Sequence, residues 1–207
     1  MKEEKTIFAD VYVAKMPDEI GNDLLFPSER QNEVLACAND RARRQKYYVW
    51  KLLGYALQRS CGLEMDALAF HKEKSGKWTV PNCYFSLSHS YNAVAVAVSN
   101  RPIGVDLELI SDRKEGILQK TLTAAERAEY ETLPPNTKLE YLIKTWTQKE
   151  SVFKKVGDGL FRPSKIVLDG QFTDTRKIAL DGEEYMLSVA ANDIADVRYY
   201  LDVDISE

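Results

Sequence analysis

The sequence predicts a mixed fold of the α+β class (α/β mixed), because helical and strand patterns alternate along its 207 residues. Two long segments, 41–61 and 139–156, carry apolar residues at helical spacing. Shorter segments have the strand period of two, most clearly 103–110, where apolar residues alternate with Asp106 and Glu108. The order strand, helix, strands occurs twice, although no sequence repeat is visible. We therefore expect two α/β halves, residues 1–100 and 101–207.

The N-terminal half is expected to begin with a β-rich strand at 6–15. A short helix should follow from Pro27 to about Ala38, with capping chemistry around Ser28. The long helix from Arg41 to Cys61 has its apolar stripe at Val49, Leu52, Leu53, Ala56 and Leu57. The remaining expected elements are a short strand at 67–70, a polar turn at 71–78, a strand at 84–90, a turn at Tyr91-Asn92 and a buried strand at 93–98.

The C-terminal half is expected to begin with the strand 103–110 and a polar loop at 111–115. Thr123 and Glu126 have the spacing of a capping box, which predicts a helix to about Leu133. Pro134-Pro135-Asn136 should break the chain before the second long helix, and Gly157 and Gly159 should end that helix. The tail is expected to form strands at 164–168, 177–180, 185–191 and 197–205, with a hairpin turn at Asp181-Gly182.

Composition excludes several classes of function. The net charge of −4 argues against a general nucleic-acid binder. No stretch approaches about 18 consecutive apolar residues, and no apolar signal segment follows Met1–Lys5, so we expect a cytoplasmic protein without a membrane anchor. Three cysteines without metal-ligand spacing are expected to be buried thiols in a reducing compartment.

Two polar patterns in the N-terminal half leave alternatives open. The second helix opens with a basic run that is either a solvated face or an anion site, since arginine suits phosphate; its members are Arg41, Arg43, Arg44, Lys46 and Lys51. The strand at 84–90 alternates Phe85, Leu87 and His89 with Ser86, Ser88 and Ser90. A Ser–His pair so close in sequence is not a hydrolase triad, and no Gly-x-Ser-x-Gly elbow is present.

The acidic residues give the strongest chemical signal. Asp106 and Glu108 should point to the same side of their strand, where two carboxylates repel unless a cation or proton joins them. Glu150 and Lys154, four residues apart, share one face of the second long helix. By itself this pair has the pattern of a weak surface ion pair. Together with the strand carboxylates it forms a plausible site for Mg²⁺ and phosphate.

Three motifs in this order resemble those of the 4'-phosphopantetheinyl transferase superfamily, in its larger, single-chain, Sfp-type branch. They are Ser88-His89-Ser90, Ile103-Gly104-Val105-Asp106-Leu107-Glu108 and Trp146-Thr147-Gln148-Lys149-Glu150-Ser151-Val152-Phe153-Lys154, with Glu150 44 positions after Asp106. The resemblance extends from about Arg30 to Lys154. It implies two similar halves related by a pseudo-twofold axis, with coenzyme A in the cleft between them and no second subunit needed to complete that cleft.

The resemblance also implies the reaction and its residues. Phosphopantetheine would pass from coenzyme A to a serine of an apo acyl or peptidyl carrier protein, releasing adenosine 3',5'-bisphosphate. Asp106, Glu108 and Glu150 would hold Mg²⁺, or Mn²⁺, and Glu150 would take the serine proton directly or through water. The catalytic set would be Glu150, Lys154 and Asp106. The coenzyme A contacts would be Arg30, Arg44, Lys77, Ser88, His89 and Lys154.

Two positions depart from the family pattern. Trp78 follows Gly76-Lys77, where proline is frequent, and the segment 29–33 offers only Arg30 where the family often has more basic residues; Arg41 or Lys46 would then take over phosphate contacts. Two other functions remain open: a Mg²⁺-dependent phosphoester hydrolase acting on a nucleotide such as coenzyme A, and a non-catalytic binding module. For a transferase, we expect the carrier to dock on Ser111–Leu133.

Overall fold

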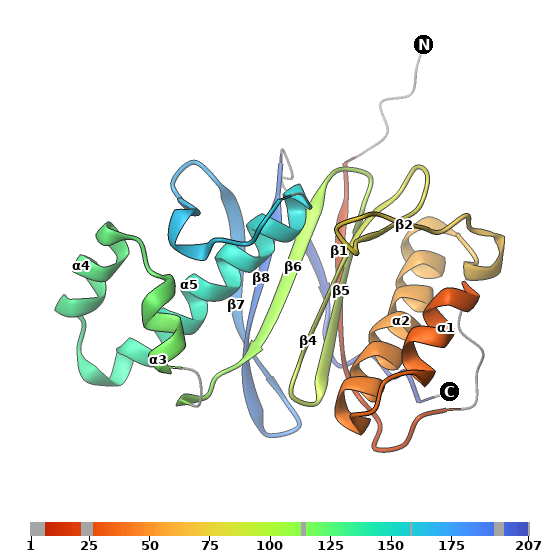
Figure 1. Ribbon diagram of the computed structural model, residues 1–207, viewed down its shortest axis with the longest axis horizontal. Helices are drawn as coiled ribbons and strands as arrows, with labels where there is room; N and C mark the ends of the chain where they lie inside the picture. The colour runs from red at the N-terminus through yellow and green to blue at the C-terminus, as the bar shows by residue number, and fades with distance from the viewer. Residues whose placement is uncertain (1–6, 22–26, 113–114, 158, 193–196, 207) are drawn as a thin grey trace, which may run out of the picture.

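Two β-sheets packed face to face form the centre of the molecule, and a long helix covers the outer face of each (Figure 1). The computed structural model describes residues 7–21, 27–112, 115–157, 159–192 and 197–206. The segment Met1–Lys5, the expected strand start at Thr6 and part of the expected 111–115 loop lie outside these residues. The mixed fold class is confirmed.

The first sheet has the strand order β4-β5-β1-β9. Its strands are β4 Tyr84–Ser90, β5 Ala93–Ser99, β1 Ala9–Lys15 and β9 Val197–Tyr200. Strands β4, β5 and β1 are antiparallel neighbours, whereas β9 pairs parallel with β1. The last strand of the chain thus completes the sheet that the first strand begins.

The second sheet has the order β6-β8-β7 and is antiparallel throughout. Its strands are β6 Ile103–Leu109, β8 Glu183–Ala191 and β7 Phe172–Leu180. In the register of β6 with β8, Asp106 lies opposite Ser188. This places the expected acidic strand at one edge of the second sheet.

Helices α1 (Ser28–Leu35) and α2 (Asp40–Cys61) lie at the end of the molecule formed by the first sheet, whereas α3 (Glu115–Leu118), α4 (Ala124–Thr132) and α5 (Pro135–Val156) lie at the other end (Figure 1). A hairpin of β2 (His71–Lys72) and β3 (Trp78–Thr79) follows α2. Single 3₁₀ turns are η1 (Met65–Ala67), η3 (Gln119–Thr121) and η4 (Pro163–Lys165). Among the described helices, none has both the length and the apolar character needed to cross a membrane.

Strand alternation divides the core into layers. In β5, the valines at 94, 96 and 98 pack with α2, and the alanines at 93, 95 and 97 face the second sheet. In β6, Ile103, Val105 and Leu107 face the first sheet. Side chains alternate across a strand, so Asp106 and Glu108 necessarily point to the other side, where α5 lies.

Several element boundaries differ from the sequence prediction. Residues 67–70 and 164–168 form no strand, because η1 and η4 curl the chain there. Strand β7 begins at Phe172 instead of residue 177, and β9 ends at Tyr200 instead of residue 205. Pro134 and Pro135 start α5 instead of preceding it, since proline fits the first helical turn, where no backbone N–H is needed. Ser28 makes no cap, because Pro27 holds the N-cap position.

The C-terminal segment returns to the N-terminal half. Arg198 on β9 donates two hydrogen bonds to the buried carboxylate of Asp10 on β1, at 2.6 and 2.9 Å. Further along, the Val203 backbone N–H donates to the Val13 carbonyl, and Ile205 enters the core under α2. The boundary between residues 100 and 101 and the pseudo-twofold relation stay predictions.

Candidate functional site between the two sheets

Three serines join the edges of the two sheets. The hydroxyl oxygens of Ser86, Ser88 and Ser90 on β4 accept hydrogen bonds from the backbone N–H groups of Val105, Leu107 and Leu109 on β6, at 3.0–3.1 Å. The two strands therefore run parallel without a backbone ladder between them. The sequence alternation of serine with larger residues has its explanation here, because the serine side of β4 faces β6.

Asp106 lies at the centre of the site. Its side chain is 4% exposed, and its Oδ1 accepts from the Ser88 hydroxyl at 2.8 Å and from the Lys154 ammonium at 2.7 Å. The Lys154 Nζ also lies 3.2 Å from the Ser88 oxygen and 3.6 Å from Oε2 of Glu150. Glu108 Oε2, one step along the strand, accepts from Ser90 at 2.8 Å. The structure thus joins Ser88, Asp106, Glu150 and Lys154 in one network.

Gly104 brings the helix close enough to make this network. A Cβ atom at position 104 would lie 1.9 Å from the Ser151 carbonyl oxygen and 2.5 Å from the Lys155 nitrogen, both in the backbone of α5. Only glycine fits under a helix at that distance. The close approach sets the distance between Lys154 on the helix and Asp106 on the strand.

The charges of the site are unbalanced toward the negative. Burial, reinforced by the nearby charges of Glu150 and Glu108, raises the pKa of Asp106 to about 6 despite the opposing effect of Lys154. Burial opposes the charged form of Lys154, but Asp106 and Glu150 outweigh it, and the pKa of Lys154 is raised. The carboxylates contribute to both shifts, since Asp106, Glu108 and Glu150 lie around the single ammonium of Lys154. Such a site has a deficit of positive charge.

A cavity of about 430 Å³ adjoins the network and is lined from both halves of the chain. Lys154, Phe153 and Gly157 contribute from the end of α5, and His89 stands at the exposed rim on β4. Burial, with the Lys154 charge second, lowers the pKa of His89. The basic residues along the wall are Arg30, Lys46, Lys72, Lys77 and Lys154. This lining favours an anionic ligand.

The basic start of α2 has mostly structural contacts. Arg43 donates twice to the Cys37 carbonyl, at 3.0 and 2.8 Å, and Arg41 lies over the ring of Tyr91. Arg44 reaches the Met16 carbonyl and Asp18, each at 3.5 Å, and it is not among the residues that line the cavity. Of the five basic residues in this run, Lys46 is the one that lines the cavity. Arg44, two residues before it, lies on the opposite side of the helix.

Arg30 and Lys77 line the cavity but hold protein contacts. Arg30 donates to the Lys46 carbonyl at 2.7 Å and lies 5.0 Å from the centre of the Trp50 ring, and burial lowers its pKa. Lys77 donates to the Lys154 carbonyl at 2.9 Å, so it caps the end of α5, and burial lowers its pKa too. Their expected phosphate contacts stay predictions.

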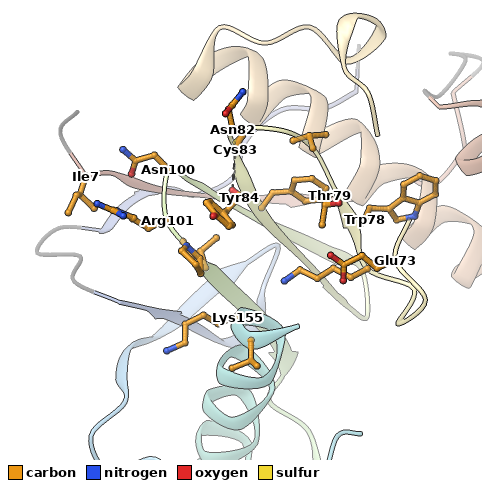
Figure 2. A pocket seen from close by; sticks show the side chains of 16 residues that line it. Ile7, Glu73, Trp78, Thr79, Asn82, Cys83, Tyr84, Asn100, Arg101 and Lys155 are labelled. Atoms are coloured by element: carbon orange, nitrogen blue, oxygen red, sulfur yellow. Dashed lines mark hydrogen bonds between the residues drawn. The ribbon is translucent and has the colours of Figure 1, made fainter. Parts of the chain in front are cut away.

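A larger cavity of about 1060 Å³ lies beyond Lys77 and Trp78. Figure 2 shows Arg101 and Lys155 reaching it from the β5–β6 turn and the end of α5, with Glu73 on the hairpin side. The Asp106 network does not line it. We place the candidate site at the smaller cavity, because chemistry depends on the charged groups and not on volume.

The carboxylates of Asp106, Glu108 and Glu150 are suitable ligands for a hard metal ion, but they are not arranged around a common point. Within the described ranges, no three His, Cys, Asp or Glu side chains converge closely enough to hold a metal. The ammonium of Lys154 lies between Asp106 and Glu150 instead. However, Oδ2 of Asp106 is buried without a hydrogen-bond partner, which leaves an oxygen ligand available. The metal assignment to Asp106, Glu108 and Glu150 stays a prediction.

Four functional contacts escaped the sequence analysis. Ser86 was predicted only as part of the polar side of a strand, and Ser90 only as a member of the Ser88-His89-Ser90 motif without a partner. Lys149 is fully buried and donates to the Thr121 carbonyl at 3.0 Å and to Glu126, which also completes the predicted capping box with Thr123. Glu33 pairs with both Arg30 and Lys72 in the cavity wall. The partners of these residues are distant in sequence, so no local sequence pattern predicts the contacts.

Comparisons with known proteins agree with this geometry. Residues 102–200 match the model of the 4'-phosphopantetheinyl transferase superfamily. The 4'-phosphopantetheinyl transferase gsp of Aneurinibacillus migulanus is 28% identical over 161 residues, 74% of this chain and 68% of that protein. A 4'-phosphopantetheinyl transferase of Bacillus subtilis is 28% identical over 115 residues, 54% of this chain and 51% of that protein. The transferase Sfp of Bacillus subtilis (strain 168) is 26% identical over the same shares of the two chains.

The matched part spans about half the length of the two Bacillus subtilis relatives and about two thirds of the Aneurinibacillus protein. The family match covers β6, α5 and the second sheet, including Asp106, Glu108, Glu150 and Lys154. Asp106, Glu150 and Lys154 therefore lie within the part of the chain that matches the 4'-phosphopantetheinyl transferase superfamily, and the relatives named here, Sfp among them, are all 4'-phosphopantetheinyl transferases.

Proposed function

We propose that this protein transfers the 4'-phosphopantetheine group of coenzyme A to a serine of an apo acyl or peptidyl carrier protein and releases adenosine 3',5'-bisphosphate. One observation carries the proposal: Lys154, which lines the basic cavity, is bonded to buried Asp106 and lies 3.6 Å from Glu150. Acidic and basic groups for phosphoryl transfer therefore meet at the mouth of a cavity suited to an anionic nucleotide.

In the proposed reaction, the serine oxygen forms a bond to the β-phosphorus of coenzyme A while the bond to the bridging pyrophosphate oxygen breaks. Glu150 accepts the serine proton, directly or through water, since its carboxylate lies 3.6 Å from the ammonium of Lys154, which lines the cavity. Lys154 offsets the negative charge that develops on the departing bisphosphate. The Ser88 hydroxyl positions Lys154 and Asp106 by hydrogen bonds to both side chains.

Asp106, Glu108 and Glu150 are the residues that would hold Mg²⁺, and Mn²⁺ suits the same oxygen ligands. A bound metal ion would neutralise the pyrophosphate and make up the deficit of positive charge among these carboxylates. Lys154 would then leave its position between Asp106 and Glu150 and turn to the phosphates. We further propose that His89, Lys77, Arg30 and Lys46, which line the cavity, contact the nucleotide. Arg44 does not line the cavity and is not included.

We propose that the carrier docks on Ser111–Leu133, of which residues 113 and 114 lie outside the described ranges. Lys149 and Glu126 connect this segment to α5 and so to Glu150. Because one chain lines the cavity from both halves, we propose a monomer. All three cysteines are free thiols, which favours a reducing compartment such as the cytoplasm.

The test is intact-mass spectrometry of apo acyl and peptidyl carriers incubated with the protein, coenzyme A and Mg²⁺. We expect one carrier to gain the mass of one phosphopantetheine, and the gain to disappear with a chelator or in Glu150→Gln. Glu140→Gln is the matched control, since Glu140 lies on the same helix and pairs with Lys177 at the surface. Breakdown of coenzyme A without any modified carrier would support a hydrolase instead, and absence of coenzyme A binding would overturn the proposal.

A further inference from the structure

The cavity beside the Asp106 network contains one acidic side chain among its basic ones. Its wall has five lysine and arginine side chains and a single carboxylate, Glu33 on α1, among the described residues that line it. A carboxylate is unexpected there, because it repels any anion that enters. Its contacts explain why it is tolerated.

Glu33 holds two of the five cations. Its Oε2 accepts from Arg30 at 2.9 Å, and its Oε1 accepts from Lys72 on the β2–β3 hairpin, 39 residues away in sequence. The Glu33 side chain is 25% exposed, and that of Arg30 is 9% exposed. The ion pair with Lys72 links α1 to the hairpin across the cavity. Despite the opposing effect of burial, Lys72 and Arg30 lower the pKa of Glu33, which keeps it ionised.

A carboxylate between an arginine and a lysine occupies the position that a phosphoryl oxygen would take. Guanidinium groups bind carboxylate and phosphate oxygens with the same planar geometry. A phosphorylated ligand in this cavity therefore either meets Glu33 as a like charge or displaces it and takes over Arg30 and Lys72. Arg30 and Lys72 already have a carboxylate partner, so binding of a phosphoryl group to these two cations exchanges one anion for another.

We propose that Glu33 is an internal counter-anion that competes with a phosphoryl group of the nucleotide for Arg30 and Lys72, and so sets how tightly this cavity holds polyphosphorylated ligands. The choice of nucleotide as ligand rests on the proposed function. Glu33 is a specificity-determining residue in this role, because removal of its charge frees two cations while the remaining amide still bonds to them.

The test compares Glu33→Gln with the wild-type protein by isothermal titration calorimetry, using adenosine 3',5'-bisphosphate, adenosine 5'-monophosphate and adenosine. We expect Glu33→Gln to bind the bisphosphate about tenfold more tightly, the monophosphate with a smaller gain and adenosine with none. Glu29→Gln is the matched control, because Glu29 is exposed on the same helix and does not line the cavity. It makes the same change in net charge and should leave all three affinities unchanged.

A second variant separates this role from a merely structural ion pair. Lys72→Met breaks the same pair but removes a cation, so it should weaken bisphosphate binding about tenfold, opposite in sign to Glu33→Gln. If the pair only stabilises the fold, both variants lower the melting temperature and weaken binding together, which overturns the proposal. Equal affinity of Glu33→Gln and wild type, including no binding by either, overturns it too.

The carrier assay with the same proteins keeps the two proposals apart. If wild type modifies a carrier but Glu33→Gln binds the nucleotide no more tightly than wild type, only the proposed role of Glu33 is rejected, and the transferase proposal stands. The expected gain in nucleotide affinity without modification of any carrier would support the role of Glu33 and reject the transferase proposal.

Discussion

At the scale of single residues, Asp106 has an unusual pKa for a carboxyl group. It is buried with a lysine partner, yet its pKa is raised to about 6 because desolvation and two neighbouring carboxylates outweigh Lys154. A carboxyl group is ordinarily ionised well below this pH, with a pKa near 3.9 in an unfolded chain. The folded protein therefore holds the Asp106 proton more tightly than the unfolded chain does.

This difference predicts how stability depends on pH in metal-free buffer. Between about pH 4 and pH 6 the native state binds more protons at Asp106 than the unfolded state does. The stabilisation that comes from this difference is fully present below pH 4 and is lost as the pH rises through 6. Asp106→Asn has no such proton. Relative to this variant, wild type should lose about 2–3 kcal/mol of unfolding free energy between pH 4 and pH 7, from about two pKa units at 1.36 kcal/mol each. Urea unfolding with a chelator present measures it, and parallel pH profiles for the two proteins would contradict it.

At the scale of elements, the contact of α5 with β6 depends on Gly104. A methyl group there would overlap backbone atoms of Ser151 and Lys155, which no side-chain rotation relieves. Gly104→Ala should therefore cost about 3 kcal/mol of unfolding free energy, near the upper end for overpacked cores. The folded fraction should also lose carrier modification, because α5 carries both Glu150 and Lys154.

The control for this prediction is Gly116→Ala. Gly116 lies in α3, and a Cβ there meets nothing within 4 Å. Alanine at that position should leave stability unchanged or raise it slightly, since alanine favours helix. If Gly104→Ala and Gly116→Ala had equal free energies of unfolding in denaturant, the packing of α5 on β6 would not depend on glycine at position 104.

Among the elements, those whose pattern lies in their own residues were easier to predict than the way they pack together. Elements specified by their own residues were predicted well: the capping box at Thr123 and Glu126, the long α2 and the alternating β4 and β6. Segment 164–168 was assigned wrongly, because its few apolar residues look like a strand while Pro163 starts a 3₁₀ turn. Arg44 was expected at a phosphate, and the structure shows that Lys46 lines the cavity whereas Arg44 does not. That choice depends on where the helix packs, which one helix alone does not reveal.

At the scale of the whole molecule, the two ends of the chain are tied by charge. Asp10 on β1 is 2% exposed and accepts two hydrogen bonds from Arg198 on β9 and one from Ser60 of α2, at 2.7 Å. A helix, the first strand and the last strand thus meet at one carboxylate. The family match ends at residue 200, just beyond this contact. Closure of the first sheet therefore depends on residues about 190 positions apart in the chain.

Removal of Arg198 should expose how much this closure contributes. Arg198→Met leaves the buried Asp10 carboxylate with only the Ser60 hydroxyl, and we expect a loss of about 2–3 kcal/mol in denaturant unfolding, the range for a charged hydrogen-bonded pair. Arg176→Met, which breaks an ion pair with Asp174 at the surface of β7, is the control and should cost under about 1 kcal/mol. Adding Asp10→Asn to Arg198→Met removes the uncompensated buried charge, so the double variant should be more stable than Arg198→Met alone. A double variant that is less stable would mean that the Asp10 carboxylate stabilises the fold through Ser60, and not through β9.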